Sequence, residues 1–426
     1  MSIQKFVFDP PLRTCRLPLR ILLLVTMMQS ILACRRFSLI TTTLKRQATI
    51  AFANAHVSSR CPSSALIQSY RSLSSLTRTK TKCTMTIADT ALGKRGEGAA
   101  LLDGLDVYTV PAIGDDHPLS VYGIESKRPI QATEDAHTVR PVLLLHGRTW
   151  SSVPVFHLLG GPQQREKGQE SRSLMEALLA NGLQPYAMDF RGFGGTPIDA
   201  TKCVEPYRCV ADVESALKWI AERHGLHDIP INGSGETRKG DMPALLGWSQ
   251  GALVAQLVAQ KSSPLLSKLI LYGSIYDPMV RYPRDPLYTT NPSPNEVEIA
   301  NTPDSAMEDF TIEGTIPPEP ARLFAEAGML SDPVKANWKH LYQFNNCDPA
   351  RVHVPTLVVA GDQDPYSSLK VQGELFSSLG RGSDRTWSIL ADADHAVHLL
   401  DGRARFANIV TSFVQNGKRS ENLIGH

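Results

Sequence analysis

The sequence contains one serine whose neighbours suit it to act as a nucleophile. The pentapeptide Gly247–Gly251 (GWSQG) has a glycine two residues before and two residues after Ser249. A predicted buried strand, Ala244–Trp248, precedes the serine, and a predicted helix, Gly251–Gln260, follows it. A serine in so tight a strand-to-helix turn has a strained backbone, and little larger than glycine fits on either side. The turn would raise the hydroxyl above the sheet and aim the backbone N–H of Gln250 at an oxyanion.

A serine hydroxyl needs a neighbouring base, and a histidine stands at a suitable place in the sequence. His395 follows the last predicted strand, Thr386–Leu390, where the chain turns back over the sheet. We predict that His395 takes the proton of Ser249. We expect His398, three residues later, to have a structural role because it falls in the next turn.

Three aspartates are candidates for the acid that orients His395. Asp362 and Asp364 follow the predicted strand Thr356–Gly361, and Asp277 follows an earlier one. We favour Asp364, because it lies farther from the strand end, on a loop that can reach His395. Asp362 is better placed to accept hydrogen bonds from backbone amides in the turn. Serine, aspartate and histidine then follow one another in that order along the chain.

The loop after the predicted strand Pro141–Leu145 is expected to supply a second oxyanion donor. Gly147 in this loop allows the backbone to approach closely, and Arg148 would donate its main-chain N–H. Nearby polar residues have expected structural roles: His146 in a hydrogen bond, and Asp189 and Arg191 in bracing the loop that they share. That loop lacks the Lys-Ser/Thr pair of a nucleotide-binding loop.

Large aromatic side chains near these segments are candidates for the wall of an acyl-binding pocket. They are Trp150, Phe193, Trp248 and Trp338, with core packing as the alternative role. No pair of cysteines has the spacing of a metal site, so we predict no metal.

Outside these segments the chain alternates between predicted strands and helices. The further predicted strands are Leu105–Val110, Leu119–Gly123, Pro185–Phe190 and Leu269–Gly273; the further helices are Ser173–Asn181, Cys209–His224 and Ala404–Val414. The first two strands flank a turn-rich segment and predict a hairpin. Strands separated by helices require right-handed crossovers, so the pattern predicts an α/β fold with a largely parallel sheet.

One long connection interrupts this alternation. We predict that residues 277–350 form a cap over the end of the sheet, with helical pieces at Pro320–Ala327 and Pro333–Tyr342, because connections of this length are usually lids or binding loops. Two hydrophilic insertions, Gly161–Glu170 and Asn232–Asp241, are expected to be surface loops.

The first 95 residues differ from the rest of the chain in charge. They hold 15 of the 44 basic side chains but only 2 of the 42 acidic ones. A segment rich in Arg, Ser and Thr is typical of transit to a mitochondrion or plastid, so we separate a leader, residues 1–95, from a domain at residues 96–420. Because the basic charge is concentrated in the leader, we predict no nucleic-acid partner.

The apolar run Ile21–Cys34 in the leader is too short for a bilayer span, although a secretory signal would look similar. Translation from Met85 would leave the domain in the cytoplasm. In the body of the chain, Cys203 and Cys209 would be able to pair after export, but we expect reduced thiols there. The sequence leaves the oligomeric state open.

Taken together, the motifs resemble those of the α/β-hydrolase superfamily, over roughly 105–414. The resemblance rests on five features in the family's order: His146-Gly147, the DxRGxG segment Asp189–Gly194, the GWSQG pentapeptide, Gly361-x-x-Asp364 and His395. It implies an eight-stranded, mostly parallel sheet with helices on both faces, a helical cap after strand six, and a Ser–His–Asp triad that needs no cofactor. The chain looks closest to the capped esterase- and lipase-like members.

The sequence also departs from other branches of the superfamily. Ser249 occupies the position where epoxide hydrolases and haloalkane dehalogenases need aspartate, and the HGGG loop of the hormone-sensitive-lipase branch is missing. We therefore expect a hydrolase of a small to medium, moderately apolar ester or thioester. Acyl transfer or carbon–carbon bond hydrolysis on the same residues is the enzymatic alternative, and an inactive ligand-binding relative is the other.

Overall fold

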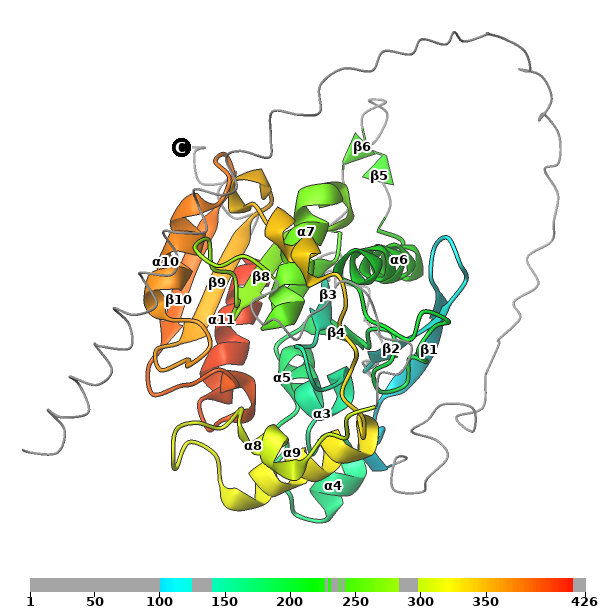
Figure 1. Ribbon diagram of the computed structural model, residues 1–426, viewed down its shortest axis with the longest axis vertical. Coiled ribbons are helices and arrows are strands. Elements are labelled where there is room, and N and C mark those ends of the chain that lie inside the picture. Colours follow the sequence, from blue (N-terminus) through cyan, green and yellow to red (C-terminus); the bar gives the residue numbers. More distant parts are fainter. Residues whose placement is uncertain are drawn as a thin grey trace, which may run out of the picture. The chain divides into compact units, whose positions relative to one another are not determined.

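The computed structural model describes residues 100–124, 140–226, 242–282 and 298–416, and the backbone of two short paired strands, β5 (Ile229–Pro230) and β6 (Thr237–Arg238). The predicted leader, residues 1–95, lies outside the described residues, as does most of the insertion Asn232–Asp241. Eight further strands form one sheet, in the order β1-β2-β4-β3-β7-β8-β9-β10 (Figure 1). Their bounds are β1 (Asp106–Pro111), β2 (Pro118–Gly123), β3 (Arg140–Leu145), β4 (Leu183–Met188), β7 (Ala244–Trp248), β8 (Lys268–Tyr272), β9 (Thr356–Gly361) and β10 (Arg385–Leu390).

Most of the sheet is parallel, as predicted. β1 pairs antiparallel with β2, and β2 pairs antiparallel with β4, which confirms the N-terminal hairpin. From β4 to β10 every pairing is parallel. The chain leaves β3 toward β4 on one side and continues toward β7 on the other, so the strand order reverses at β3. In parallel sheets the carboxyl ends beside such a reversal are where ligands bind.

Helices cover both faces of the sheet. One face packs against α3 (Ser152–Phe156), α5 (Leu174–Ala180) and α11 (Arg403–Gln415), and the other against α6 (Pro206–Arg223), α7 (Gln250–Lys261) and α10 (Leu369–Ser378) (Figure 1). Successive residues of the central strand β3 alternate between the two cores: Val142 and Leu144 face the first, Leu143 and Leu145 the second. A strand buried on both faces needs the continuous apolar run that the sequence shows there.

The bounds of β4 and α6 differ from the sequence prediction for physical reasons. β4 begins at Leu183, because the register pairs that residue with Arg140 at the start of β3. It ends before Phe190, whose N–H donates to His146 Nε2 at 3.1 Å instead of to a neighbouring strand. Helix α6 begins three residues earlier than predicted, at Pro206, because proline is well suited to the first turn of a helix.

The segment between β8 and β9 carries α8 (Pro303–Met307), α9 (Pro318–Ser331) and the 3-10 turns η3 (Leu341–Asn346) and η4 (Pro349–Arg351). The prediction of a helix at Pro333–Tyr342 is wrong. This stretch is largely extended, because its backbone groups pair with distant segments: Lys335 N–H donates to the carbonyl of Ile299 at 2.8 Å, and Lys339 N–H donates to that of Val204 at 2.9 Å.

Three smaller features complete the comparison with the sequence. The insertion Gly161–Glu170 contains a short helix, α4 (Pro162–Glu166), rather than loop alone. Cys203 and Cys209 are free and buried, as expected, and so is Cys347. Across the described ranges, no helix is both long enough and apolar enough to span a bilayer.

A buried arginine ties together the elements at the β1–β2 end of the sheet. The guanidinium of Arg191 is 4% exposed and contacts three carboxylates: Asp115 in the β1–β2 turn at 2.6 Å, Asp199 at 3.1 Å and Asp212 in α6 at 2.7 Å. The prediction that Arg191 braces its loop is confirmed. Because Asp212 is 1% exposed, its charge depends on this one guanidinium for compensation.

We predict that Arg191→Met lowers the free energy of unfolding by about 3–5 kcal/mol, because it leaves the buried carboxylate of Asp212 unpaired. Chemical denaturation of the purified protein measures the loss. Removing both charges, in Arg191→Met/Asp212→Leu, is expected to recover part of it. The control is Arg322→Met, whose exposed guanidinium pairs with Glu319 and Glu326 on the same helix. Equal losses in Arg191→Met and Arg322→Met would contradict the account.

Candidate active site

Ser249 lies at the junction of β7 and α7 with an unusual backbone conformation. Its φ of 57° and ψ of −121° are rare for any residue with a Cβ atom. The turn is held by hydrogen bonds on both sides: Ser249 N–H donates to the carbonyl of Tyr272 at 3.0 Å, and the Ser249 carbonyl accepts from Ala252 N–H at 3.1 Å. Its hydroxyl does not cap the helix that follows, so it remains available to the space above the sheet.

The glycines around this turn are required by contact distances. A Cβ on Gly247 would lie 2.3 Å from the carbonyl oxygen of Gly251, and a Cβ on Gly251 would lie 2.3 Å from that of His146. Both contacts are with backbone, which cannot move aside cheaply. Gly147 is also close, since a Cβ there would lie 3.3 Å from that of Ser249. The sequence pattern GxSxG therefore reflects how tightly β3, β7 and α7 pack at this point.

His395 and Asp364 form a buried pair on the neighbouring loops. His395 Nδ1 and Asp364 Oδ2 are 2.8 Å apart, and the two side chains are 3% and 0% exposed. The other oxygen of Asp364 accepts from the N–H groups of Tyr366, at 2.9 Å, and Ser367, at 3.1 Å. These bonds fix the carboxylate, and the carboxylate fixes the imidazole, so that Nε2 is the ring nitrogen left for a third group.

The loop of His395 is also fastened to the strand that carries the serine. The indole N–H of Trp248 donates to the carbonyl of His395 at 2.9 Å, and the two rings lie 5.2 Å apart. Ser249 and His395 line the same cavity. Among the described residues there is no direct hydrogen bond between them, and contacts of this kind often tighten only when substrate binds.

Two opposing effects set the pKa of His395. Burial of the ring lowers it, and the charge and hydrogen bond of Asp364 raise it, with smaller contributions from Asp309 and Asp394; the net result is a pKa above the usual 6.5. The buried His146 and His398 show what happens without a carboxylate partner, because burial lowers the pKa of each to about 3.

Of the three aspartates weighed from the sequence, Asp364 is the one that meets His395. Asp362 instead accepts from Ala393 N–H at 3.2 Å, which agrees with the expected bond to a backbone amide. Asp277 accepts from Met279 N–H within its own turn. His398 bonds to Tyr272 Oη through Nδ1 at 2.9 Å, in agreement with its expected structural role.

The loop after β3 is anchored from several directions. His146 accepts from Phe190 N–H, as expected of a structural residue, and the indole N–H of Trp338 donates to the carbonyl of Arg148 at 3.0 Å. Asp332, at the end of α9, accepts from Ser151 N–H at 2.8 Å and from Gly194 N–H at 3.0 Å. The β8–β9 segment therefore helps to hold the peptide that carries the predicted oxyanion donor.

The carboxylates near this loop are buried and share hydrogen bonds with backbone amides. Asp189 accepts from Tyr122 Oη at 2.7 Å and from the N–H groups of Ser152 and Gly195, and so braces its loop as expected. Burial raises the pKa of Asp189 to about 6 and that of Asp332 to about 7.

A cavity of about 530 Å³ opens above Ser249. Trp150, Trp248 and Trp338 line it, and so do Gly147 and Arg148. Phe193 is not among the lining residues; its ring packs behind the wall, against His146 and Trp338.

The β8–β9 segment supplies much of the remaining wall. Ser305, Glu308, Asp309 and Lys335 line the cavity from this segment. Tyr366, two residues after Asp364, lines it as well and packs edge-on against His395 at 4.8 Å. No sequence motif marks Asp309 or Lys335. For Tyr366, its short distance in sequence from Asp364 was the available signal.

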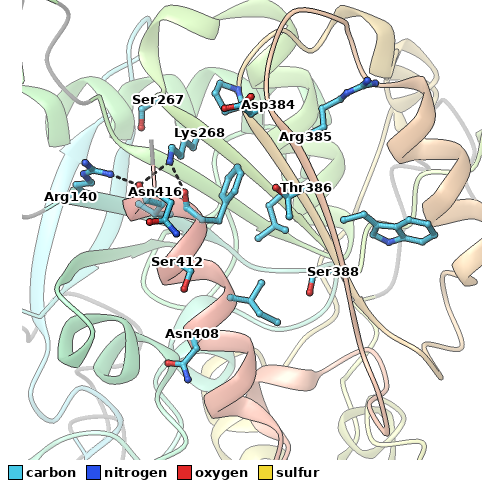
Figure 2. Close-up of a pocket in the computed structure, with 16 residues that line it drawn as sticks. Arg140, Ser267, Lys268, Asp384, Arg385, Thr386, Ser388, Asn408, Ser412 and Asn416 are labelled. Carbon is cyan, nitrogen blue, oxygen red and sulfur yellow. Dashed lines mark hydrogen bonds between the residues drawn. The ribbon is translucent and has the colours of Figure 1, made fainter. Parts of the chain in front are cut away.

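A larger cavity, of about 840 Å³, lies elsewhere in the fold. It is bounded by residues at the amino ends of β3, β8 and β10, including Arg140, Lys268 and Arg385, and by the last turns of α11 (Figure 2). Arg140 and Lys268 donate to carbonyls at the C-terminal end of α11, among them that of Val414. Arg140 and Lys268 are therefore hydrogen-bonded to the end of α11, and Ser249 lies at the opposite end of the strands. We place the candidate active site at the cavity of about 530 Å³ that Ser249 lines.

The effect of Asp364 on the pKa of His395 can be tested without an activity assay. In Asp364→Asn, burial is no longer opposed by the carboxylate, so the pKa of His395 is expected to fall from above 6.5 to below it. NMR titration of the imidazole signals measures both values. The matched control is Asp362→Asn, on the same loop, which should leave the pKa of His395 unchanged. An unshifted pKa in Asp364→Asn would show that the pair does not form in solution.

Comparison with known proteins assigns the chain to a family. The profile described as "Alpha/beta hydrolase family" matches residues 142–409. A search of curated proteins found no match. Similar solved structures include an esterase from Thermogutta terrifontis (TM-score 0.49, 15% identity, covering 73% of this chain and 98% of that one). Others are the carboxylesterase CesB from Bacillus subtilis (0.48, 14%, 77% and 96%) and the thioesterase domain from the curacin biosynthetic pathway (0.45, 14%, 72% and 99%).

At these identities and TM-scores, the similar structures support no inference about substrate. The family profile, in contrast, is sufficient to assign the family. It spans more than half of the 426 residues and includes Ser249, Asp364 and His395. The eight-stranded, mostly parallel sheet agrees with it. The chain belongs to the alpha/beta hydrolase family.

Proposed function

We propose that the protein is a serine hydrolase that cleaves a small to medium, moderately apolar carboxylic ester or thioester through an acyl-enzyme. The observation that carries the proposal is the buried hydrogen bond between His395 Nδ1 and Asp364 Oδ2, beside a cavity that Ser249 also lines. An imidazole whose Nδ1 is held by a carboxylate presents Nε2 to accept a hydroxyl proton.

The proposed reaction has two halves. Ser249 Oγ attacks the carbonyl carbon while its proton passes to His395 Nε2, and the backbone N–H groups of Gln250 and Arg148 hold the oxyanion. The tetrahedral intermediate then collapses, and the leaving alcohol or thiol takes the proton from His395. Water, deprotonated by the same imidazole, then attacks the acyl-enzyme. The second tetrahedral intermediate collapses, the proton passes from His395 to Ser249 Oγ, and the acid is released.

Several features of the site support these roles. Gln250 is the first residue of α7, where a backbone N–H has no partner within the helix and the helix dipole favours negative charge. Gly147 brings the loop of Arg148 against Ser249. The cavity of about 530 Å³ falls within the range of small-molecule sites, and its tryptophans suit an apolar acyl group. We propose that the β8–β9 segment, residues 277–350, serves as the cap that closes this cavity.

The proposal predicts that Ser249→Ala lowers kcat for p-nitrophenyl butyrate at least about 10³-fold, because the acyl-enzyme can no longer form. Folding should be retained, which circular dichroism and the melting temperature check. Ser305→Ala is the matched control, since this serine lines the same cavity from α8, and its kcat should stay within about threefold of wild type. Comparable activity in Ser249→Ala and wild type would refute the proposal.

Product analysis separates hydrolysis from acyl transfer on the same residues. With an added alcohol as competing nucleophile, a hydrolase releases chiefly the free acid and a transferase chiefly the new ester. An inactive ligand-binding relative would show no difference between Ser249→Ala and wild type in either product.

A further inference from the structure

One carboxylate in the wall of the cavity has no partner in the reaction described above. Asp309, in the β8–β9 segment, is half-buried and lines the same cavity as Ser249 and His395. Within the described parts of the chain, its side chain makes no hydrogen bond and no ion pair with another residue. A half-buried carboxylate that the protein leaves uncompensated is open to a donor or a positive charge from a ligand.

The position of Asp309 is fixed by anchors on both sides of it. Tyr366 Oη donates to the carbonyl of Glu308 at 3.1 Å. Two residues after Asp309, Thr311 N–H donates to Asp394 Oδ2 at 2.9 Å, and Asp394 directly precedes His395. The stretch that carries Asp309 is therefore hydrogen-bonded both to the loop of Asp364 and to the loop of His395. These bonds fix the position of Asp309 in the cavity wall.

The charges around Asp309 are also one-sided. The charged groups that act on it most strongly are His395, Asp394, Glu308 and Asp364, of which only the histidine is a base. The two cationic residues that line the cavity, Arg148 and Lys335, are exposed and not in this set. Burial raises the pKa of Asp309 to about 6, so the group is mostly ionised at neutral pH.

Aromatic rings line the same cavity as this carboxylate. Tyr366 and Trp248 flank His395, and Trp338 and Tyr282 line the same cavity. The faces of such rings attract ammonium groups and also accept the alkyl carbons attached to them. A carboxylate together with aromatic walls matches the two parts of a protonated alkylamine, its N–H and its carbons.

The chemistry of the site indicates which part of the substrate Asp309 meets. In the proposed hydrolysis, His395 returns its proton to the oxygen or sulfur of the leaving group, so the groups nearest His395 face that part of the substrate. Asp309 lies two residues before Thr311, which is tied to Asp394, the residue directly before His395, and Asp309 and His395 line the same cavity. We propose that Asp309 is a specificity-determining residue that binds a protonated amine carried by the leaving alcohol or thiol of the substrate. This inference rests on the proposed ester hydrolysis.

Two butyrate esters of equal shape test the inference with the full-length protein. One is 3-(dimethylamino)propyl butyrate, which is protonated at neutral pH, and the other is 4-methylpentyl butyrate, in which carbon replaces nitrogen. Release of butyric acid gives kcat/KM for each. We expect wild type to prefer the amine ester by about tenfold or more, because a charge-assisted hydrogen bond in a partly buried site has that order of effect.

The variant Asp309→Asn keeps the shape of the side chain and removes its charge. We expect the preference for the amine ester to fall to near one. Because Asp309 also helps to raise the pKa of His395, the measure is the ratio of kcat/KM for the two esters within the variant. Glu308→Gln is the matched control, because it removes the charge of the adjacent, exposed carboxylate in the same wall; it should retain the preference.

The outcomes separate this inference from the function on which it rests. Equal use of both esters by wild type, a preference that survives Asp309→Asn, or an equal loss for both esters in that variant would overturn the inference. In each of these cases, hydrolysis of the neutral ester that disappears in Ser249→Ala would leave the proposed function standing. Failure of wild type to cleave either ester, with Ser249→Ala no different, would overturn both.

Discussion

The backbone of Ser249 is held where residues with a Cβ atom are rarely found, and the rest of the site is arranged around that turn. The conformation persists because β3, β7 and α7 approach so closely that Gly247 and Gly251 have no room for a side chain. Strain of this kind is stable only when the surrounding structure determines it. The parallel sheet does so, because β7 is flanked by β3 and β8 and buried along its whole length. The turn then presents the serine hydroxyl at the carboxyl ends of the strands.

The pKa of His395, which lines the same cavity as Ser249, depends on a balance between burial and charge. His395 is as buried as His146 and His398, yet it alone of these three bonds to a carboxylate, and it alone has a raised pKa. Asp364 therefore does more than orient the ring: its charge opposes the effect of burial and raises the pKa of the imidazole. The β8–β9 segment completes the environment, since Trp338 and Asp332 hold the loops after β3 and β4.

Much of this arrangement could be predicted from the sequence, because local rules govern it. The buried strands, the GWSQG turn and the order of Ser249, Asp364 and His395 follow from apolar runs and from turn chemistry that act over a few residues. Asp364 could be preferred over Asp362 because it lies farther along the loop, where it can reach His395, whereas Asp362 is placed to bond to backbone amides in the turn. The hydrogen bonds of the two residues agree with that choice.

The parts that could not be predicted depend on contacts between distant segments. Pro333–Tyr342 has the composition of a helix but is extended, because Lys335 and Lys339 hydrogen-bond to backbone far away in the chain. Asp309 belongs to no motif, and its place in the cavity wall results from anchors at Glu308 and Thr311 that only the folded chain brings together. Phe193 has the residue type of a pocket wall but packs behind it.

The most direct test of the account is to find which side chain a serine-directed fluorophosphonate modifies in the full-length protein. Digestion and mass spectrometry of the labelled chain locate the adduct. The account predicts one adduct, on the hydroxyl of Ser249, and its loss in His395→Gln, because the hydroxyl is a poor nucleophile without the base. An unlabelled Ser249, or labelling that is equally fast without the imidazole, would contradict the claim that this strained turn and this buried base act together.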